Sequence, residues 1–477
     1  MSHCSDAAFN YLREHQDENI ERIRTFLRQP AVASAGIGGR ESAAMLMDFY
    51  RALGCQEVEL IENGTDFPGV WAYLDAGRDK TLVNYCMYDT KPAQLDKWPV
   101  APYEAVVDHI EGLGTAVFGP GAKGRKAPYV QWLNAVRAVL ETSGRLPVNI
   151  AFLAEGEENM GSPHYAQYID QYKDRVKGAI GCFCPGASQD AEGNVSIHLG
   201  YKGLAYLKLT ASGSRWGKGP QKADAHGMAQ VMVDSPAWRL VYALGQLFDA
   251  ESGRVLVPGF YDKVSTPTQE EQQELSELAD LTRSTAWQKV LGGFGDAKTS
   301  LDHLDHQSAF AHFFYQPSFN LNGLAAGYVG PGSPVFTLPR EAYAMLDVRL
   351  PRGYRTRETI TLIERHLDSI GLGDIDVEVI AAHDPSHTEQ SSPFVQLAHQ
   401  AVSETGAQIT YWPYSGGGGP WSKFSSEFGM PVLFDVGLGH GGRAGGPGEY
   451  LVLESECKAA GNLDAEAFYA GLLERLG

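Results

Sequence analysis

The chain has 477 residues, more than one hydrophobic core usually organises, so we expect two domains. Its formal net charge of −19 argues against nucleic acid or an anionic membrane as a partner, because a strongly acidic chain repels both. Six scattered cysteines without zinc-finger spacing are typical of reduced thiols. No apolar run approaches the roughly 18 residues that span a membrane. Residues 1–27 have the pattern of an amphipathic helix rather than a signal peptide, so we expect a cytoplasmic protein.

Helices and short strands alternate over the first 200 residues. Apolar positions recur every three or four residues in the predicted helices, and the predicted strands are short apolar runs. The expected helices cover residues 6–27, 40–53, 128–143 and 162–172, and the expected strands cover 57–61, 70–74, 81–85, 149–154 and 178–182. This alternation predicts an α/β layered domain with a largely parallel sheet.

The pattern changes at about residue 203. Strands and helices no longer alternate strictly, which predicts a small α+β insert. The expected strands of the insert cover residues 204–210, 341–349 and 375–381, and its helices cover 236–248, 269–280 and 357–370. A helix over 394–404 and a buried strand over 432–436 then return to the first pattern. We therefore predict a discontinuous catalytic-like α/β domain over 1–203 and 383–477, and an inserted α+β lid over 204–382.

Several sequence motifs occur in a recognisable order. They are MYDTKPAQLDKWPVAPYEA from residue 87, FLAEGEENMGSPHY from residue 152, LGYKGLAYLKL from residue 199, GRVLVPGFYDKV from residue 253, and the stretch 317–351. Together they resemble the dinuclear-zinc aminoacylase and dipeptidase family, which includes cytosolic carnosinase, acetylornithine deacetylase and succinyl-diaminopimelate desuccinylase. The dipeptidase branch is the most similar. The resemblance implies a layered catalytic domain with an inserted lid that forms a homodimer, and two zinc ions that activate a shared water.

The positions that hold zinc in this family carry other residues here. They are Met87, Gly124, Asn159, Cys184 or Pro185, and Gly445. Zinc is bound by imidazoles, thiolates and carboxylates, and most of these side chains offer none of them. We therefore expect no metal cofactor.

Other positions of the resemblance keep their functional residue types. The resemblance implies that Asp89 is the orienting aspartate, Glu158 the general base, and His226 the lid histidine that reaches across a dimer. It implies that Arg349 and Asn320 hold a substrate carboxylate or developing charge, an arrangement that suits an arginine fork. The substrate-facing loop 415–420 contributes Gly417 and Gly418, and Tyr414 replaces the arginine of the family.

New positive charges accompany the lost ligands. Lys126 matches a lysine of the family, whereas Lys123 and Arg125 are specific to this chain. We interpret them as fixed charges near the site, although they would equally suit a solvated loop. Asp89 and Glu158 could likewise be hydrogen-bonded loop carboxylates, and Arg349 could form a structural ion pair. The cysteines at positions 86, 182 and 184 are more typical of inert packing than of thiolate chemistry.

Three functions are compatible with these residues. The first hypothesis is a metal-independent enzyme that acts on a small amino-acid-like or dipeptide-like substrate with a carboxylate. Glu158 would be its general acid and base, His226 would stabilise or relay charge, and Lys126 or Arg125 would replace the zinc. The reaction would be amide hydrolysis, or an elimination, isomerisation or condensation.

The second hypothesis is a non-catalytic protein that keeps only the substrate-binding pocket. The third is a zinc dipeptidase with relocated ligands. The candidate ligands for that third function are Cys86, Cys184, Asp89, Glu158 and His440.

Overall fold

The computed structural model describes residues 4–291, 297, 303–328, 330, 332 and 336–477. The chain divides into two compact units. The first unit comprises Met1–Gly200, His387–Pro413 and Lys423–Gly477, and the second comprises Tyr201–Ser386 and Tyr414–Ser422. The second unit is thus an insertion into the first, but it also includes the loop 414–422, which the sequence assigns to the catalytic-like domain. The catalytic and lid roles of these units stay predictions.

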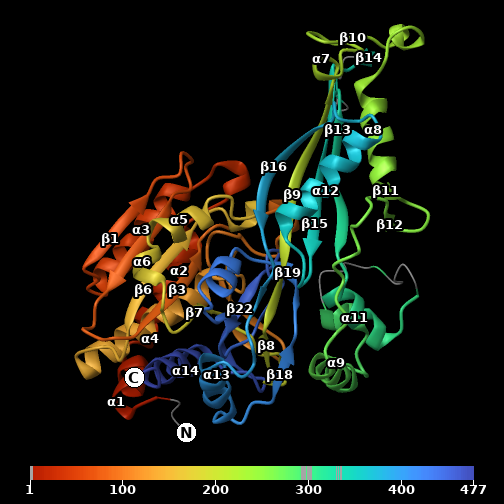
Figure 1. The fold of residues 1–477 in the computed structure, drawn as a ribbon. Helices are drawn as coiled ribbons and strands as arrows, with labels where there is room; N and C mark the ends of the chain where they lie inside the picture. Colours follow the sequence, from red (N-terminus) through yellow and green to blue (C-terminus); the bar gives the residue numbers. More distant parts are fainter. Residues whose placement is uncertain (1–3, 292–296, 298–302, 329, 331, 333–335) are drawn as a thin grey trace. The chain divides into compact units, whose positions relative to one another are not determined.

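The first unit is built on a mixed six-stranded sheet (Figure 1). Its strand order is β1 (Glu57–Ile61), β2 (Gly69–Leu74), β6 (Asn149–Glu155), β3 (Thr81–Met87), β7 (Cys182–Pro185) and β20 (Val432–Val436). The last four strands run parallel, whereas β1 and β2 join antiparallel. Strand β6 is buried at every position, as expected for a central strand covered on both faces.

Helices cover this sheet. α4 (Lys126–Ser143) packs against α1 (Asp6–Glu14), α2 (Gln16–Arg28) and α14 (Asn462–Glu474), while α3 (Gly39–Ala52) packs against β1 and β2. α13 (Pro393–Ser403) packs against α14. The predicted single helix over 6–27 is wrong, because His15 separates α1 from α2. The His15 imidazole Nδ1 lies 2.8 Å from the carbonyl oxygen of Tyr11, where it competes with the helical hydrogen bonds.

Smaller sheets complete the first unit. One contains β4 (Val107–Ile110), β5 (Gly114–Phe118), β22 (Tyr450–Ser455) and β21 (Gly441–Gly442), and another pairs β8 (Val195–His198) with β18 (Ile409–Trp412). These strands were not predicted from the sequence. The predicted strand over 178–182 lies three to four residues too early, since β7 covers Cys182–Pro185.

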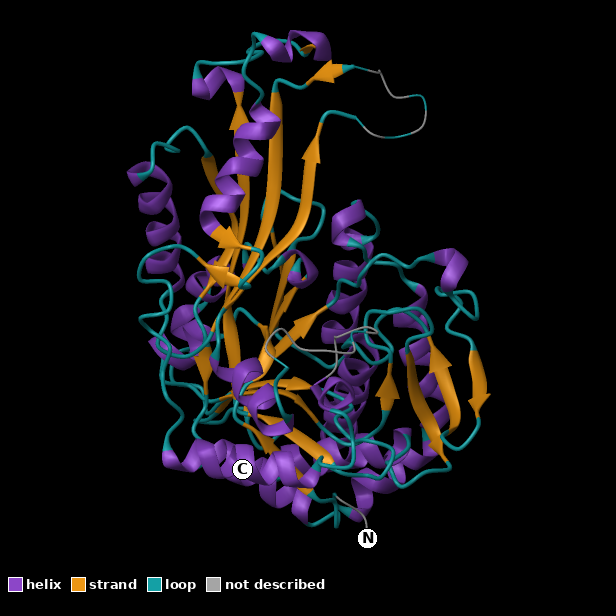
Figure 2. Ribbon diagram, turned by 90° about the vertical axis from the view of Figure 1, so that its right-hand side faces the viewer, coloured by secondary structure: helices purple, strands orange, loops and turns teal. Residues whose placement is uncertain are grey.

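The second unit is built on a long antiparallel sheet, whose strands are prominent in Figure 2. Its order is β13 (Ser318–Ala326), β15 (Glu341–Leu350), β9 (Gly200–Ser212) and β16 (Asp376–His383). β19 (Ser415–Gly418) adds to β9 in parallel. Alternate residues of β9 and β15 point into an apolar core that they share with α8 (Pro236–Leu247) and α12 (Thr356–Ser369). The other face of this sheet therefore carries the polar side chains.

The second unit also contains the helices α7 (Gly213–Trp216), α9 (Gln269–Leu281), α10 (Trp287–Leu291) and α11 (His306–Tyr315). α9 begins with a capping box, in which Thr268 and Glu271 each accept a hydrogen bond from the other's backbone N–H. The predicted α/β class with an α+β insert is confirmed. Among the described residues, no helix is both long and apolar enough to cross a membrane.

Candidate functional site

The carboxyl ends of the parallel strands bring charged residues together in the first unit. Asp89 follows β3, Glu158 follows β6, and Asp435 lies near the end of β20. Neighbouring parallel strands present their carboxyl ends at one edge of the sheet, which is where α/β proteins bind ligands. This edge is the candidate site of the first unit.

Asp89 organises the acidic turn that follows β6. Its buried carboxylate accepts hydrogen bonds from the backbone N–H groups of Glu158 and Asn159, at 3.1 and 2.9 Å. The Asn159 side chain returns a bond to the carbonyl of Asp89 at 3.3 Å. Burial raises the pKa of Asp89 to about 6, although the two N–H groups favour its charged form. The structure thus brings together Asp89 and Glu158, both predicted from sequence.

A third carboxylate, Glu155, lies beside them and was not predicted. It ends the buried strand β6, and its Oε1 accepts hydrogen bonds from the Tyr85 hydroxyl at 2.6 Å and the Ser162 hydroxyl at 2.9 Å. Burial raises the pKa of Glu155 well above its usual value, and the charges of Asp89 and Glu158 add to this effect. The available sequence signal was a glutamate directly after the predicted apolar strand over 149–154.

Lys123 and Arg125, the two basic residues that the family lacks, both form ion pairs with Asp435. Its Oδ1 lies 2.6 Å from Arg125 Nη1 and 3.2 Å from Lys123 Nζ. The Arg125 guanidinium also stacks 4.0 Å above the centre of the Phe434 ring. Burial would raise the pKa of Asp435, but the charges of Arg125 and Lys123 outweigh it and hold the pKa below its usual value.

The backbone at this ion pair is unusual. Asp435 has a φ of 61° and Arg125 a φ of 112°, values that residues with a side chain rarely adopt. Strained backbone of this kind persists only where surrounding contacts hold it, and it often occurs at functional sites. The ion pair between Arg125 and Asp435 is one such contact.

A fifth carboxylate, Glu449, connects two loops of the site. Its oxygens accept hydrogen bonds from the backbone N–H groups of Gly121, Lys123, Gly124 and Gly445. Gly124 and Gly445 are two of the positions that the resemblance assigns to zinc ligands. Backbone N–H donors therefore surround an anion at the point where the family places metal ligands.

Lys126 is buried and points to a helix end. Its Nζ donates to the carbonyl oxygens of Gln29 at 2.6 Å and Phe26 at 3.4 Å, at the carboxyl end of α2. Burial lowers the pKa of Lys126 to about 7, although Cys86 and Asp89 favour the charged form. Its role toward a reacting group stays a prediction.

The other predicted residues lie in the second unit. Arg349 in β15 pairs with Asp347 through Nε at 2.7 Å and Nη2 at 3.2 Å. Gly418 lies beside it, because a Cβ added there would be only 3.0 Å from Arg349 Nη1. Asn320 is exposed in β13 and pairs in register with Asp347. The structure thus places Arg349, Gly418 and Asn320 on the same sheet.

His226 lies apart from that group. It sits in β10 (Ala225–His226), at the end of the long sheet opposite β19 (Figure 1). The side chain is exposed, and its Nδ1 accepts a hydrogen bond from the Met228 N–H at 3.2 Å. Within one chain, the second unit therefore does not bring His226 to Arg349.

The loop residues differ in their surroundings. Tyr414 is fully buried and packs edge-on against Tyr315, with ring centres 5.6 Å apart. Gly417 is exposed, and its N–H donates to the Ser415 hydroxyl at 3.2 Å. The substrate-binding roles predicted for Tyr414 and Gly417 stay predictions.

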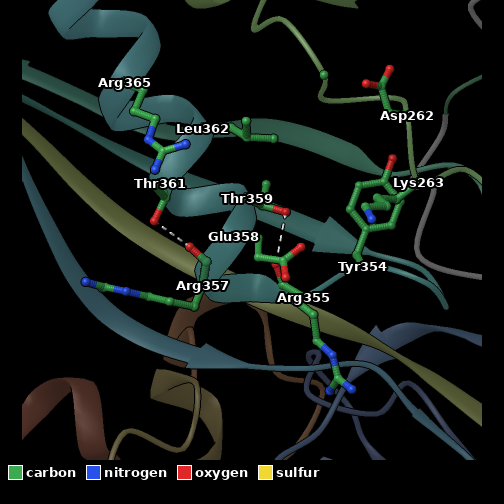
Figure 3. A pocket seen from close by; sticks show the side chains of 11 residues that line it. Asp262, Lys263, Tyr354, Arg355, Arg357, Glu358, Thr359, Thr361, Leu362 and Arg365 are labelled. Atoms are coloured by element: carbon green, nitrogen blue, oxygen red, sulfur yellow. Dashed lines mark hydrogen bonds between the residues drawn. The ribbon is translucent and has the colours of Figure 1, made fainter.

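The second unit also has a pocket of about 400 Å³ beside α12 (Figure 3). Its lining includes Arg355, Arg357, Arg365 and Lys263, but none of the site residues predicted from sequence. Figure 3 shows Arg355 and Arg357 extending in different directions from the helix. These two guanidinium groups therefore do not converge on one point.

Comparison with known proteins gives a consistent result. The sequence profile of peptidase family M20/M25/M40 matches residues 88–467. The chain is 26% identical over 462 residues to the Cys-Gly metallodipeptidase DUG1 of Candida albicans, covering 89% of each protein. It is 25% identical over 387 residues to human Beta-Ala-His dipeptidase, covering 76% of this chain and 71% of the relative.

A solved structure is also similar. The M20 family metallo-carboxypeptidase Sso-CP2 from Sulfolobus solfataricus superposes with a TM-score of 0.77 at 26% identity. The superposition covers 96% of this chain and 98% of the other. The resemblance inferred from the sequence motifs is confirmed.

These relatives overturn one prediction. The expectation of no metal cofactor is wrong, because the similar proteins include a metallodipeptidase and a metallo-carboxypeptidase. The replaced residues at five positions were too narrow a basis for excluding a metal from a chain that follows the family over most of its length.

The described residues nevertheless do not fit a metal ion at the family's positions. Within the described ranges, no group of three or more His, Cys, Asp or Glu side chains could hold one. The Glu449 carboxylate is surrounded by N–H donors, and the Asp435 carboxylate is paired with two cations. Hydrogen bonds thus already occupy the oxygens of Glu449, and two cations already balance the charge of Asp435, so neither carboxylate is free to bind a metal ion.

Proposed function

The chain belongs to peptidase family M20/M25/M40, and on that premise we propose that it hydrolyses small peptides of dipeptide size that carry a free carboxylate. The observation that carries the proposal is the buried Asp89 carboxylate, which fixes the turn bearing Glu158 at the carboxyl edge of the parallel sheet. The curated relatives act on Cys-Gly and Beta-Ala-His dipeptides, which supports this substrate size.

In this proposal Glu158 is the general base and acid. It takes a proton from the attacking water and returns one to the leaving amine, as a positioned carboxylate does in amide hydrolysis. Asp89 acts indirectly, since its hydrogen bonds to two N–H groups hold the turn in place.

Residues of the second unit are proposed to hold the substrate carboxylate. Arg349 donates to Asp347 through Nε and Nη2, which leaves Nη1 without a hydrogen bond to another described residue. An arginine edge of this kind suits a carboxylate, and Gly418 leaves room beside it. Asn320, Gly417 and Tyr414 are proposed as further substrate contacts.

The test is an assay with a panel of dipeptides, including Cys-Gly and Beta-Ala-His. We expect turnover by the wild-type chain and a loss of at least about 100-fold in kcat for Glu158→Gln, because general base catalysis contributes roughly that much. Glu111→Gln is the control, since Glu111 is exposed in the turn between β4 and β5 of the same unit. Wild-type turnover by Glu158→Gln would reject the assignment. Binding of dipeptides without any turnover would instead show a non-catalytic binding protein.

A second candidate function is a zinc dipeptidase with relocated ligands drawn from Cys86, Cys184, Asp89, Glu158 and His440. The metallopeptidase relatives favour it over chemistry without metal. Elemental analysis of chain purified without chelator decides between them. Stoichiometric zinc, together with activity that is lost on chelation and restored by zinc, supports this candidate. Undiminished activity in chain that contains no metal contradicts it.

We also propose that the chain forms a homodimer through the second unit, as the resemblance to the family implies. This proposal is supported by a group of large apolar side chains that are exposed to solvent in the single chain. Met228, Val231, Met232 and Trp238 are each more than half exposed, and all four lie within a short stretch of the second unit. Exposed apolar groups of this size mark interaction surfaces.

A further inference from the structure

The polar face of the long sheet in the second unit gathers basic side chains at one end. In the sheet register, Arg349 of β15 and His383 of β16 both lie opposite Leu204 of β9. Lys202 is two residues before Leu204 on the same strand, so it points to the same face. Cross-strand neighbours on one face lie close enough to interact. Lys202, Arg349 and His383 therefore share one region of the sheet.

Lys202 is a buried cation without a carboxylate partner among the described residues. Only 5% of the residue is exposed. Its Nζ donates one hydrogen bond, to the carbonyl oxygen of Gln316 at 2.7 Å, and lies 5.8 Å from the centre of the Phe313 ring. An ammonium has three donors, and a buried charge is costly unless it is paired. Burial, with help from the charge of Arg349, lowers the pKa of Lys202 to about 7.

His383 is similarly unsatisfied. Its Nδ1 is buried and has no hydrogen-bond partner within the described part of the chain. Burial and the charge of Arg349 lower the pKa of His383 to about 3. A buried ring nitrogen without a partner is uncommon in folded proteins and requires an explanation.

Gly418 lies beside the Arg349 and His383 side chains and the backbone of Lys202. A Cβ at this position would lie 3.0 Å from Arg349 Nη1, 3.0 Å from His383 Cε1 and 2.8 Å from the Lys202 carbonyl oxygen. Of the carboxylates described around these groups, only Asp347 is bonded to one of them, through Arg349. The Arg349 and His383 side chains thus approach one glycine, while the Lys202 side chain lies on the same face of the sheet. An anionic ligand would accept hydrogen bonds from Arg349 Nη1 and from the remaining donors of the Lys202 ammonium.

Resting on the proposed function, we propose that Lys202 and His383 form with Arg349 a subsite for two carboxylates. The preferred substrate is then a dipeptide whose carboxyl-terminal residue is aspartate or glutamate. Arg349 holds the terminal carboxylate, and Lys202 holds the side-chain carboxylate with His383 beside it. Lys202 is the residue that determines the preference for an acidic side chain.

A purely structural role for Lys202 makes a different prediction. If the ammonium only satisfies the Gln316 carbonyl, replacing it with an apolar residue of similar shape leaves substrate preference unchanged. The two interpretations therefore differ in selectivity, and selectivity is the quantity to measure.

The test compares Ala-Glu with Ala-Gln, which differ in charge but hardly in shape. We expect wild-type kcat/KM to be about tenfold or more higher for Ala-Glu, because hydrogen bonds to charged groups contribute roughly this factor. Lys202→Met should bring the ratio near one. Lys208→Met is the matched control, since Lys208 lies on the same strand and face but is paired with Glu378. A wild-type ratio of one, or an unchanged ratio in Lys202→Met, overturns the subsite.

A binding measurement separates this proposal from the proposed function. If neither dipeptide is hydrolysed, the peptidase assignment fails, and calorimetry with N-acetylglutamate and N-acetylglutamine then tests the subsite alone. We expect about tenfold tighter binding of N-acetylglutamate to the wild-type chain and equal affinities in Lys202→Met. Equal affinities in the wild-type chain, or no binding of either compound, overturns the subsite whatever the assay shows.

Discussion

Glu466 shows how a single buried residue sets a pH dependence in the first unit. Its carboxylate accepts hydrogen bonds from the side-chain amides of Asn19 and Asn134, both at 2.8 Å, and of Asn462 at 3.1 Å. These residues come from α2, α4 and α14. Burial raises the pKa of Glu466 to about 7 even though the three amides favour the charged form.

We predict that the free energy of unfolding falls as the pH rises from the usual pKa of Glu466 to its raised pKa in the folded chain. Between its usual pKa of 4.5 and about 7, the folded chain keeps a proton that the unfolded chain has released. The stabilisation is therefore fully present below 4.5 and lost by about pH 7, with a size of at most about 3 kcal/mol. Glu466→Gln mimics the protonated form and should remove this part of the pH dependence.

Thermal and denaturant unfolding from pH 4 to 9 would measure the effect. Glu14→Gln is the control, because Glu14 is exposed in α1. Parallel pH profiles for the wild-type chain and Glu466→Gln would show that Glu466 titrates at its usual value.

At the scale of residues, sequence reasoning identified only part of the site. Asp89 and Glu158 lie in recognisable motifs, so their positions could be predicted. Asp435 and Glu449 could not, because their partners in the loop around Lys123 are more than 300 residues away in sequence. Such contacts are set by which strands are neighbours, and a single sequence does not contain this information.

At the scale of elements, strong periodicity predicted structure well. The helices over 236–248, 269–280 and 357–370 match α8, α9 and α12 to within a residue or two. β13 was missed because it is an exposed edge strand whose alternation of polar and apolar residues breaks at the irregularity between Leu321 and Gly323. β7 was misplaced because it ends in Pro185, a residue that rarely occurs inside strands. Pro185 is tolerated because it is the last residue of β7, where the sheet does not need a backbone N–H from it.

At the scale of the whole molecule, the insertion could be predicted from the change in pattern near residue 203. The loop 414–422 could not, since its assignment to the second unit depends on the pairing of β19 with β9. Those two strands lie far apart in sequence. The candidate substrate contacts Gly417 and Gly418 thus belong to the same unit as Arg349.

The exposed apolar residues of the second unit lead to a prediction about assembly. We expect a dimer in solution, because Met232 and Trp238 are 85% and 67% exposed and burying them would stabilise association. Met232→Lys should shift the chain toward monomer in sedimentation velocity experiments. Leu95→Lys is the control, since Leu95 is similarly exposed but lies in the first unit.

A wild-type chain that remains monomeric at all accessible concentrations would contradict the proposed dimer. An equal shift in Leu95→Lys would mean that the lysine acts through general charge and not through this surface.

The insertion also constrains the order in which the chain can fold. Cys182 of β7 pairs with Val432 of β20, on the other side of the inserted unit in sequence. Closing so long a loop costs entropy before any contact compensates it. During synthesis, β3, β6 and β7 leave the ribosome long before the strand that completes their sheet. Until β20 is synthesised, the backbone N–H and C=O groups along one edge of β7 have no partner strand. We therefore expect the chain to be most prone to aggregation during this interval.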